Sequence, residues 1–394
     1  MNWKYTLKIS CPKLVIDGEL VRYEVSVASE HLNTMKLFYE LDKEHIAMVS
    51  DYADAALVGL LMPAMYHGED IHLEGKVSEN IYWNISFRLQ KLLQIFIPSL
   101  SQINIYAKKI IARDESMQKG HECATGFSGG IDSFCALADY FYNPLCPKSS
   151  KVTMLTFNNV GSHWSGEKGH NLFLKRYNEL LSITKNIGLP FVKIDSNLDE
   201  FYKNESELRF IKTLVMRNAS VALLLQKGVR KFLHSSSHFY EHIAVNSNVQ
   251  PITRTEPFIF QLLSSCDTME ILSVGSEYKR VEKIEIVSNI KESYKNLDVC
   301  TTEGAGKKNC SACVKCLRTL TALDALGTLE LYKESFDLKT YKQNKNKFLG
   351  KVLARNNEFT NEIYELALKK KFAFPVMSYL YSVYYRLRYL IKKR

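Results

Sequence analysis

The sequence predicts an α/β fold in which helices cover both faces of a parallel sheet. Three observations lead to this prediction. From residue 122 onward, short apolar runs without polar alternation recur, as in strands that are buried on both faces. Amphipathic segments with helical spacing separate these runs. The chain has 394 residues, 46% of them hydrophobic, which is enough for more than one domain with a core of normal size.

The first part of the chain, residues 1–118, is expected to form a separate α+β domain. The segment 21–27 alternates apolar and polar residues, which is the period of a half-buried strand. The segment 78–98 has apolar residues on one helical face, begins at Ser78, a suitable N-cap, and ends at Pro98. We find no catalytic motif in this domain, so its expected role is packing or partner binding.

The second predicted domain covers residues 119–328 and contains the alternating strands and helices. Its expected strands are the segments 122–127, 152–158, 191–195 and 230–235. Its expected helices are the segments 131–142, 167–188, 205–227, 277–290 and 314–326. Ligands of parallel sheets of this kind bind beyond the carboxyl ends of the strands. The loops that follow the strands are therefore the places to look for a site.

The loop after the first of these strands, Ser128-Gly129-Gly130-Ile131-Asp132-Ser133, has the features of a phosphate-binding site. Its glycines allow the backbone to approach a ligand closely, and the first amides of the following helix lie at the positive end of the helix dipole. The two serines add hydroxyl donors. Asp132 would repel phosphate, but it can hold a Mg²⁺ ion that bridges it to the phosphates.

This segment resembles the PP-loop of the N-type ATP pyrophosphatases, which are similar to the adenine nucleotide alpha-hydrolases and carry the signature Ser-Gly-Gly-x-Asp-Ser. The resemblance implies a Rossmann-like, HUP-type fold. The family adenylates its substrate, releases pyrophosphate and lets a nitrogen or sulfur nucleophile displace AMP. The resemblance implies catalytic roles for Ser128, Asp132 and Ser133. The implied nucleotide-binding residues of the loop are Phe127, Ser128, Gly129, Gly130, Ile131, Asp132 and Ser133.

Four cysteines near the end of the second predicted domain have the spacing of a metal site. They form two overlapping Cys-x-x-Cys steps and one more distant ligand, a pattern typical of tetrahedral Zn²⁺. Four thiolates leave no open coordination position, so we expect a structural zinc. A redox dithiol and an iron–sulfur cluster are the alternatives. The four residues are Cys300, Cys310, Cys313 and Cys316.

A PP-loop followed by a four-cysteine site resembles the 7-cyano-7-deazaguanine synthase family. The resemblance implies that Arg217 and Asn218 contact the nucleotide or the substrate and that Lys283 contacts phosphate. Without this resemblance, we would expect Arg217 to form a salt bridge on a helix surface and Lys283 to lie on a solvated face. The family's enzymes activate a carboxylate with ATP and add ammonia, giving an amide and then a nitrile.

Two segments depart from the family's pattern, so the substrate is expected to differ. They are 158–164, after the second strand, and 234–242, after the fourth. The latter holds His234, His238 and His242, which would share one face if this segment were helical. They are candidates for substrate binding or acid–base chemistry. The alternative is a loop with unrelated histidines.

The last part of the chain, residues 329–394, is expected to be a helical, basic extension broken at Pro375. Its end is rich in tyrosine and leucine and then becomes basic. Three interpretations compete: packing on the protein's own core or on a partner, including a second copy; an interfacial membrane helix; and a nucleic-acid tail. We favour packing, with the membrane surface second and nucleic acid last.

The sequence therefore predicts a cytoplasmic, ATP-dependent ligase that forms C–N bonds, AMP and pyrophosphate and uses Mg²⁺ and Zn²⁺. No secretory signal is visible. The net charge of +10 would suit an anionic partner such as a nucleotide, but we favour a modest basic surplus spread over a large surface, except at the C-terminus, where basic residues cluster. The expected partners are ATP and an acyl substrate, either small or macromolecular. The alternatives are a tRNA-modifying sulfur or C–N transferase of the same superfamily and a nucleotide-binding module without turnover.

Overall fold

The structure is a computed structural model that falls into two compact units, each described separately. The first unit comprises residues 1–126, 145–236 and 241–274, and the second comprises residues 127–144, 237–240 and 275–394. These units do not follow the predicted boundaries at residues 118 and 328. The residues that the structure describes are 5–32, 35–112, 122–164, 166–203, 205–246, 251–264, 269–300, 309–355 and 357–393.

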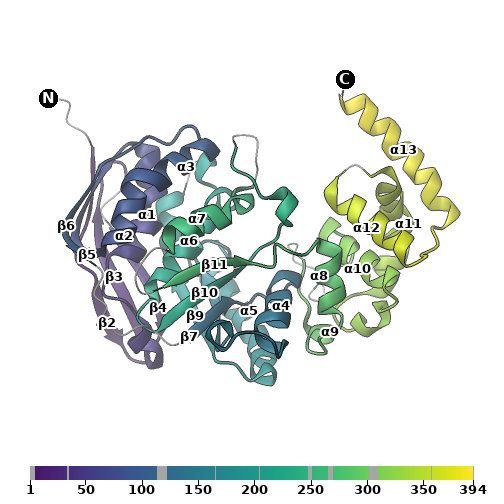
Figure 1. Ribbon diagram of the computed structural model, residues 1–394, viewed down its shortest axis with the longest axis horizontal. Coiled ribbons are helices and arrows are strands. Elements are labelled where there is room, and N and C mark those ends of the chain that lie inside the picture. The colour runs from purple at the N-terminus through teal and green to yellow at the C-terminus, as the bar shows by residue number, and fades with distance from the viewer. Residues whose placement is uncertain are drawn as a thin grey trace. The chain divides into compact units, whose positions relative to one another are not determined.

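The described part of the first unit contains one sheet of eleven strands (Figure 1). Their order is β11-β10-β7-β8-β9-β4-β3-β1-β5-β6, and β2 pairs with β3. The strands are β1 (Thr6–Ile9), β2 (Lys13–Asp17), β3 (Leu20–Ala28), β4 (Met35–Asp42), β5 (Asp70–Ser78), β6 (Ile105–Ile111), β7 (Glu122–Gly126), β8 (Met154–Asn159), β9 (Phe191–Ser196), β10 (Val229–Ser235) and β11 (Glu270–Val274).

The strands β7 to β11 form a five-stranded parallel part of this sheet, and β1, β5 and β6 also pair in parallel. Counted along the chain from β7, their spatial order is 3-2-1-4-5, so the direction of winding reverses between β7 and β10. Every residue of β8 except Asn158 is buried, as expected for a strand in the interior of a covered sheet. Helix α5 (Gly166–Ile187) packs against β8 and β9. The structure confirms the predicted α/β class.

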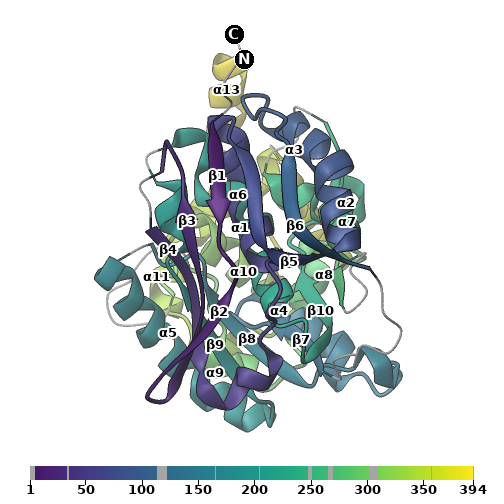
Figure 2. The ribbon, with the colours of Figure 1, turned by 90° about the vertical axis from the view of Figure 1, so that its left-hand side faces the viewer.

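The N-terminal strands, which face the viewer in Figure 2, continue the same sheet. Strand β4 pairs antiparallel with β9, and Tyr39 lies opposite Ser196. Helix α1 (Asp54–His67) packs against helix α6 (Phe210–Leu224). The hydroxyl of Tyr39, on β4, lies 2.8 Å from the hydroxyl of Ser220, on α6. The region that was expected to form a separate domain therefore shares its core with the parallel strands.

The remaining helices are short in the first unit and longer toward the C-terminus of the second. In the first unit they are α2 (Glu79–Asn84), α3 (Gln90–Phe96) and α7 (Glu256–Leu263). In the second unit they are α4 (Ile131–Leu137), α8 (Arg280–Val287), α9 (Ser293–Asn296), α10 (Val314–Ala325), α11 (Leu338–Ala354), α12 (Glu358–Lys369) and α13 (Val376–Lys393). Among the described helices, none combines the length and the apolar character that crossing a membrane requires.

The contact between α1 and the parallel part of the unit gives a test of the shared core. A Cβ atom on Gly59 of α1 would lie 2.7 Å from the Tyr39 hydroxyl and 3.2 Å from Cδ1 of Leu198. Gly59→Val should therefore lower the free energy of unfolding by about 1–3 kcal/mol, because overpacking forces neighbouring groups to move. Chemical denaturation followed by circular dichroism measures the difference.

Gly126→Ala is the matched control, because nothing lies within 4 Å of the Cβ atom that it adds. It should change the free energy of unfolding by less than about 1 kcal/mol. A Gly59→Val protein as stable as the wild type would show that the two parts of the first unit do not pack as described.

Candidate functional site

The loop that follows β7 is a tight turn held against a later segment of the second unit. Gly129 has φ +73°, a conformation that L side chains rarely adopt. Its carbonyl oxygen accepts a hydrogen bond of 2.8 Å from the backbone N–H of Asp298. Gly130 is the N-cap of α4, and a Cβ atom there would lie 3.3 Å from the carbonyl oxygen of Asp298. The two glycines thus allow the loop and this segment to approach closely.

Helix α4 presents donor groups at its start. It continues as a π-helical turn as far as Tyr142, so the helical stretch covers the predicted range. As in any helix, the first amides have no acceptor within the helix itself. Ser128 is exposed, whereas Phe127 and Ser133 are buried. The Ser133 hydroxyl donates a hydrogen bond of 3.0 Å to the Gly130 carbonyl.

Asp132, in the first turn of α4, is paired with two cations. Arg280 approaches its two carboxylate oxygens with two guanidinium nitrogens, at 2.9 and 3.0 Å. Lys283 Nζ lies 3.2 Å from Oδ1 of the same carboxylate. Burial alone would raise the pKa of Asp132, but the charges of Arg280 and Lys283 outweigh this effect and hold the pKa below its usual value. Asp132 is therefore ionised at neutral pH.

The two cations come from one face of helix α8. They are three residues apart, which places them on neighbouring turns of the same face. The Lys283 side chain is 1% exposed and the Arg280 side chain 9%. The sequence predicted Lys283 as a phosphate contact, and the structure places it beside the loop. Arg280 was not predicted from the sequence, although its spacing of three residues from Lys283 on a helix was a usable signal.

Two further cations act on this site from helix α10. Burial and the charges of Arg318 and Arg280 lower the pKa of Lys315. Burial and the charge of Arg280 lower the pKa of Arg318 to about 10, and Asp132 opposes the shift. These mutual effects mean that four cations act on one another near Asp132, and Glu358 and Glu362 of α12 also act on Arg318. Such a group of cations beside the loop suits a polyanionic ligand such as a phosphate chain.

The four cysteines form a cluster beside α10. All four sulfur atoms lie within 4.8 Å of one another, and the pairs Cys300–Cys313 and Cys310–Cys316 are 3.9 Å apart. Zinc bound tetrahedrally at about 2.3 Å from each sulfur requires sulfur–sulfur distances of about 3.8 Å. Cys310 Sγ also accepts a hydrogen bond of 3.3 Å from the N–H of Cys313. The donor set and its geometry fit a metal ion such as zinc.

A short segment, 297–300, connects the cysteine cluster to the loop. The side-chain oxygen of Asn309 accepts hydrogen bonds from the N–H groups of Val299 and Cys300, at 2.9 and 3.2 Å. Its amide nitrogen donates to the Leu297 carbonyl at 2.7 Å. The N–H of Asp298, in the middle of this segment, donates to the loop as described above. The cluster residue Cys300 thus lies two residues from Asp298, whose N–H contacts the loop.

Arg217 and Asn218 belong to the first unit, whereas the loop and Lys283 belong to the second. Arg217 is 1% exposed and donates to the Val160 carbonyl at 3.0 Å, to Asp199 at 2.5 Å and to Leu208 at 3.2 Å. Its guanidinium also stacks on the ring of Tyr202, with 3.8 Å to the centroid. These contacts tie three loops to α6.

The contacts of Arg217 do not fit the salt bridge on a helix surface that we gave as the alternative. Asn218 accepts a hydrogen bond of 3.3 Å from the side chain of Asn158 and donates one of 2.9 Å to the Leu214 carbonyl. A contact of either residue with a ligand stays a prediction.

The three histidines do not share a helical face. His234 lies in β10, one residue before its end, with Nε2 3.5 Å from Oε2 of Glu256. His238 lies in a bend, and His242 ends a short 3₁₀ turn. A common acid–base face therefore does not form, because the chain turns between them instead of continuing as a helix. The spacing of four was a weak signal, since it has meaning only within a helix.

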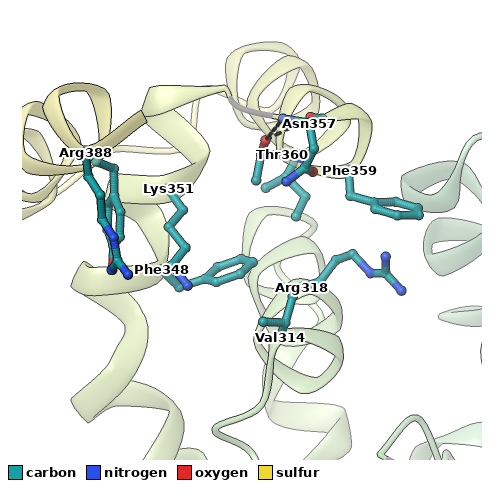
Figure 3. Close-up of a pocket in the computed structure, with 10 residues that line it drawn as sticks. Val314, Arg318, Phe348, Lys351, Asn357, Phe359, Thr360 and Arg388 are labelled. Carbon is teal, nitrogen blue, oxygen red and sulfur yellow. Dashed lines mark hydrogen bonds between the residues drawn. The ribbon is translucent and has the colours of Figure 1, made fainter. Parts of the chain in front are cut away.

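A cavity of about 340 Å³ lies among helices α10, α11, α12 and α13 of the second unit (Figure 3). Arg318, Lys351 and Arg388 contribute positive charge to its lining, and none of the lining residues that the structure describes is acidic. Its apolar walls include Phe348 and Phe359. The guanidinium of Arg318 lies 4.0 Å from the centroid of the Phe359 ring. This lining suits an anionic group attached to an apolar or aromatic body.

No family model, curated protein or solved structure with which the chain was compared matches it.

The cysteine cluster gives a direct test. Protein purified without added metal should contain about one zinc ion per chain, measured by elemental analysis. Cys313→Ser should lose most of it, because three thiolates hold the ion less well than four. The loss should lower the Tm by roughly 5–10 °C, since the metal stabilises the folded state.

Cys146→Ser serves as the control, because Cys146 lies outside the cluster. It should retain zinc and the wild-type Tm. Iron with visible absorption in the purified protein would favour the iron–sulfur alternative, and an unchanged zinc content in Cys313→Ser would exclude the proposed ligand set.

Proposed function

We propose that the protein is an ATP-dependent ligase of the PP-loop class, which adenylates a substrate, releases pyrophosphate and transfers the activated group to a nitrogen nucleophile. The observation that carries this proposal is the pair of buried cations, Arg280 and Lys283, that lie beside the loop. Both contact the carboxylate of Asp132 directly, and Lys315 and Arg318 add positive charge nearby. A bound polyanion would give these cations further acceptors and complete the site.

In this proposal the loop and α8 together hold the β- and γ-phosphates. The amides at the start of α4 and the exposed hydroxyl of Ser128 donate to phosphate oxygens. Arg280 and Lys283 add charge-assisted hydrogen bonds. Because negative charge develops on the departing pyrophosphate during adenylation, donors fixed in advance stabilise the transition state more than the bound ATP.

Asp132 is the candidate ligand for Mg²⁺, which prefers carboxylate oxygens and phosphates. In the structure its oxygens are engaged by Arg280 and Lys283. Binding of Mg-ATP would therefore require an exchange of partners: the two cations turn to phosphate oxygens, and the carboxylate becomes available to the ion. The ion would supply charge neutralisation at the leaving group.

The order of the parallel strands supports the proposed Rossmann-like, HUP-type fold. The order 3-2-1-4-5 reverses between β7 and β10, and the loop 127–130 follows β7 directly. Ligands of open α/β sheets bind at such a reversal, beyond the carboxyl ends of the strands.

A nitrogen nucleophile is better supported than a sulfur carrier. Cys135 lies two residues beyond Ser133 in α4, but burial raises its pKa to about 12, so the thiol is protonated and unreactive at neutral pH. The cluster cysteines are arranged for a metal. The acyl substrate would bring its own anionic group, and the cavity beside Arg318 is a candidate place for it.

The reaction is tested with the purified full chain, Mg-ATP, ammonium and a panel of small carboxylic acids. At least one acid should give AMP and pyrophosphate in equal amounts. Asp132→Asn should lower the rate of pyrophosphate release by about 100-fold or more, because the loop loses its metal ligand. Asp139→Asn, two turns further along the same helical stretch, should retain the wild-type rate. Release of ADP and phosphate, or an unaffected Asp132→Asn enzyme, would contradict the proposal.

A further inference from the structure

Helix α13 is docked with its polar residues inward and its apolar residues outward. The inward polar residues are Ser378 and Ser382, which are 0% and 5% exposed, and one tyrosine, Tyr385, is buried beside them at 8% exposed. A helix at the surface of a protein in water normally has the opposite arrangement. The residues on its outer side are apolar or aromatic and all about half exposed or more: Val376, Met377, Tyr379, Leu380, Val383, Tyr384 and Leu387.

Close backbone packing fixes this orientation. A Cβ atom on Gly350 of α11 would lie 2.3 Å from Cβ of Tyr381, so the two helices can approach only because residue 350 is a glycine. Small inward side chains, such as Ser382, permit the same approach. Arg386 donates a hydrogen bond of 2.9 Å to the Leu353 carbonyl at the end of α11. The helix therefore cannot rotate to bury its apolar face without losing these contacts.

The helix pair α11 and α13 is strongly cationic. Neither helix contains an aspartate or glutamate, whereas α11 carries five lysines and α13 carries two arginines and two lysines. Arg386 and Arg388 precede and follow Leu387 in the sequence. At 100° per residue they lie on either side of the apolar face. An apolar face flanked by basic residues is typical of helices that lie in the surface of an anionic membrane.

We propose that α13 binds an anionic lipid surface, with its apolar face in the headgroup region and its flanking arginines near lipid phosphates. Tyrosine is suited to this region because its ring is apolar and its hydroxyl is polar. A second copy of the chain is a weaker candidate, because it would bring two cationic helix pairs together. The proposal goes beyond the enzymatic function and does not depend on it.

Flotation of the full chain with lipid vesicles tests this proposal. The protein should float with vesicles of phosphatidylglycerol and phosphatidylcholine in equal parts and stay unbound with phosphatidylcholine alone. The double variant Leu380→Glu/Leu387→Glu should lose binding by about tenfold or more, because it places two carboxylates in the apolar face. Leu145→Glu is the matched control: Leu145 is 87% exposed and lies in the first unit, so binding should persist.

Thermal unfolding of the double variant shows whether it remains folded, which is expected because both leucines face outward. Absence of flotation on anionic vesicles, equal flotation on neutral ones, or a double variant that floats like the wild type would overturn the proposal. A dimer in light scattering that the double variant dissociates, without lipid binding, would assign the face to a second copy.

Discussion

The carboxylate of Asp132 pairs with two cations at once, and the candidate site of the second unit depends on this pairing. Unpaired, buried Arg280 and Lys283 side chains would each cost several kcal/mol. Asp132 compensates for part of this cost and links α4 to α8. Lys315 and Arg318 add positive charge nearby, and Glu358 and Glu362 of α12 also act on Arg318. The same arrangement that holds the loop in place thus keeps Arg280 and Lys283 beside it, where a phosphate chain could accept hydrogen bonds from them.

The cysteine cluster is connected to the same site through the backbone. Asn309 holds the segment 297–300, in which Asp298 contacts Gly129 and Cys300 reaches the cluster. Helix α10 has Cys313 as its N-cap and carries Lys315 and Arg318. A metal ion that fixes the start of α10 would therefore fix both the cations and one wall of the loop. A structural zinc would in this way have a functional consequence, although four sulfur ligands leave it no open position.

Local patterns predicted much of this architecture, and long-range pairing explains what they missed. Short motifs predicted the clustering of the four cysteines and the start of α2 after Ser78. They also predicted how far the helix after the loop extends. The antiparallel pairing of β4 with β9 could not be foreseen, because an alternating strand can pair with any free edge of a sheet. The burial of Arg217 also escaped prediction, since one of the carbonyls that it binds, that of Val160, comes from a loop 57 residues away in the sequence.

The central claim is that the loop, Arg280 and Lys283 bind the pyrophosphate part of ATP. Calorimetric titration of the full chain with inorganic pyrophosphate and Mg²⁺ tests it without any acyl substrate. Lys283→Met, which should fold because it keeps the length of the buried side chain, should weaken binding about 10- to 100-fold, the effect of one lost charge-assisted hydrogen bond. Lys279→Met, at the N-cap of α8, should bind like the wild type. Equal affinity of the wild type and Lys283→Met would contradict the account.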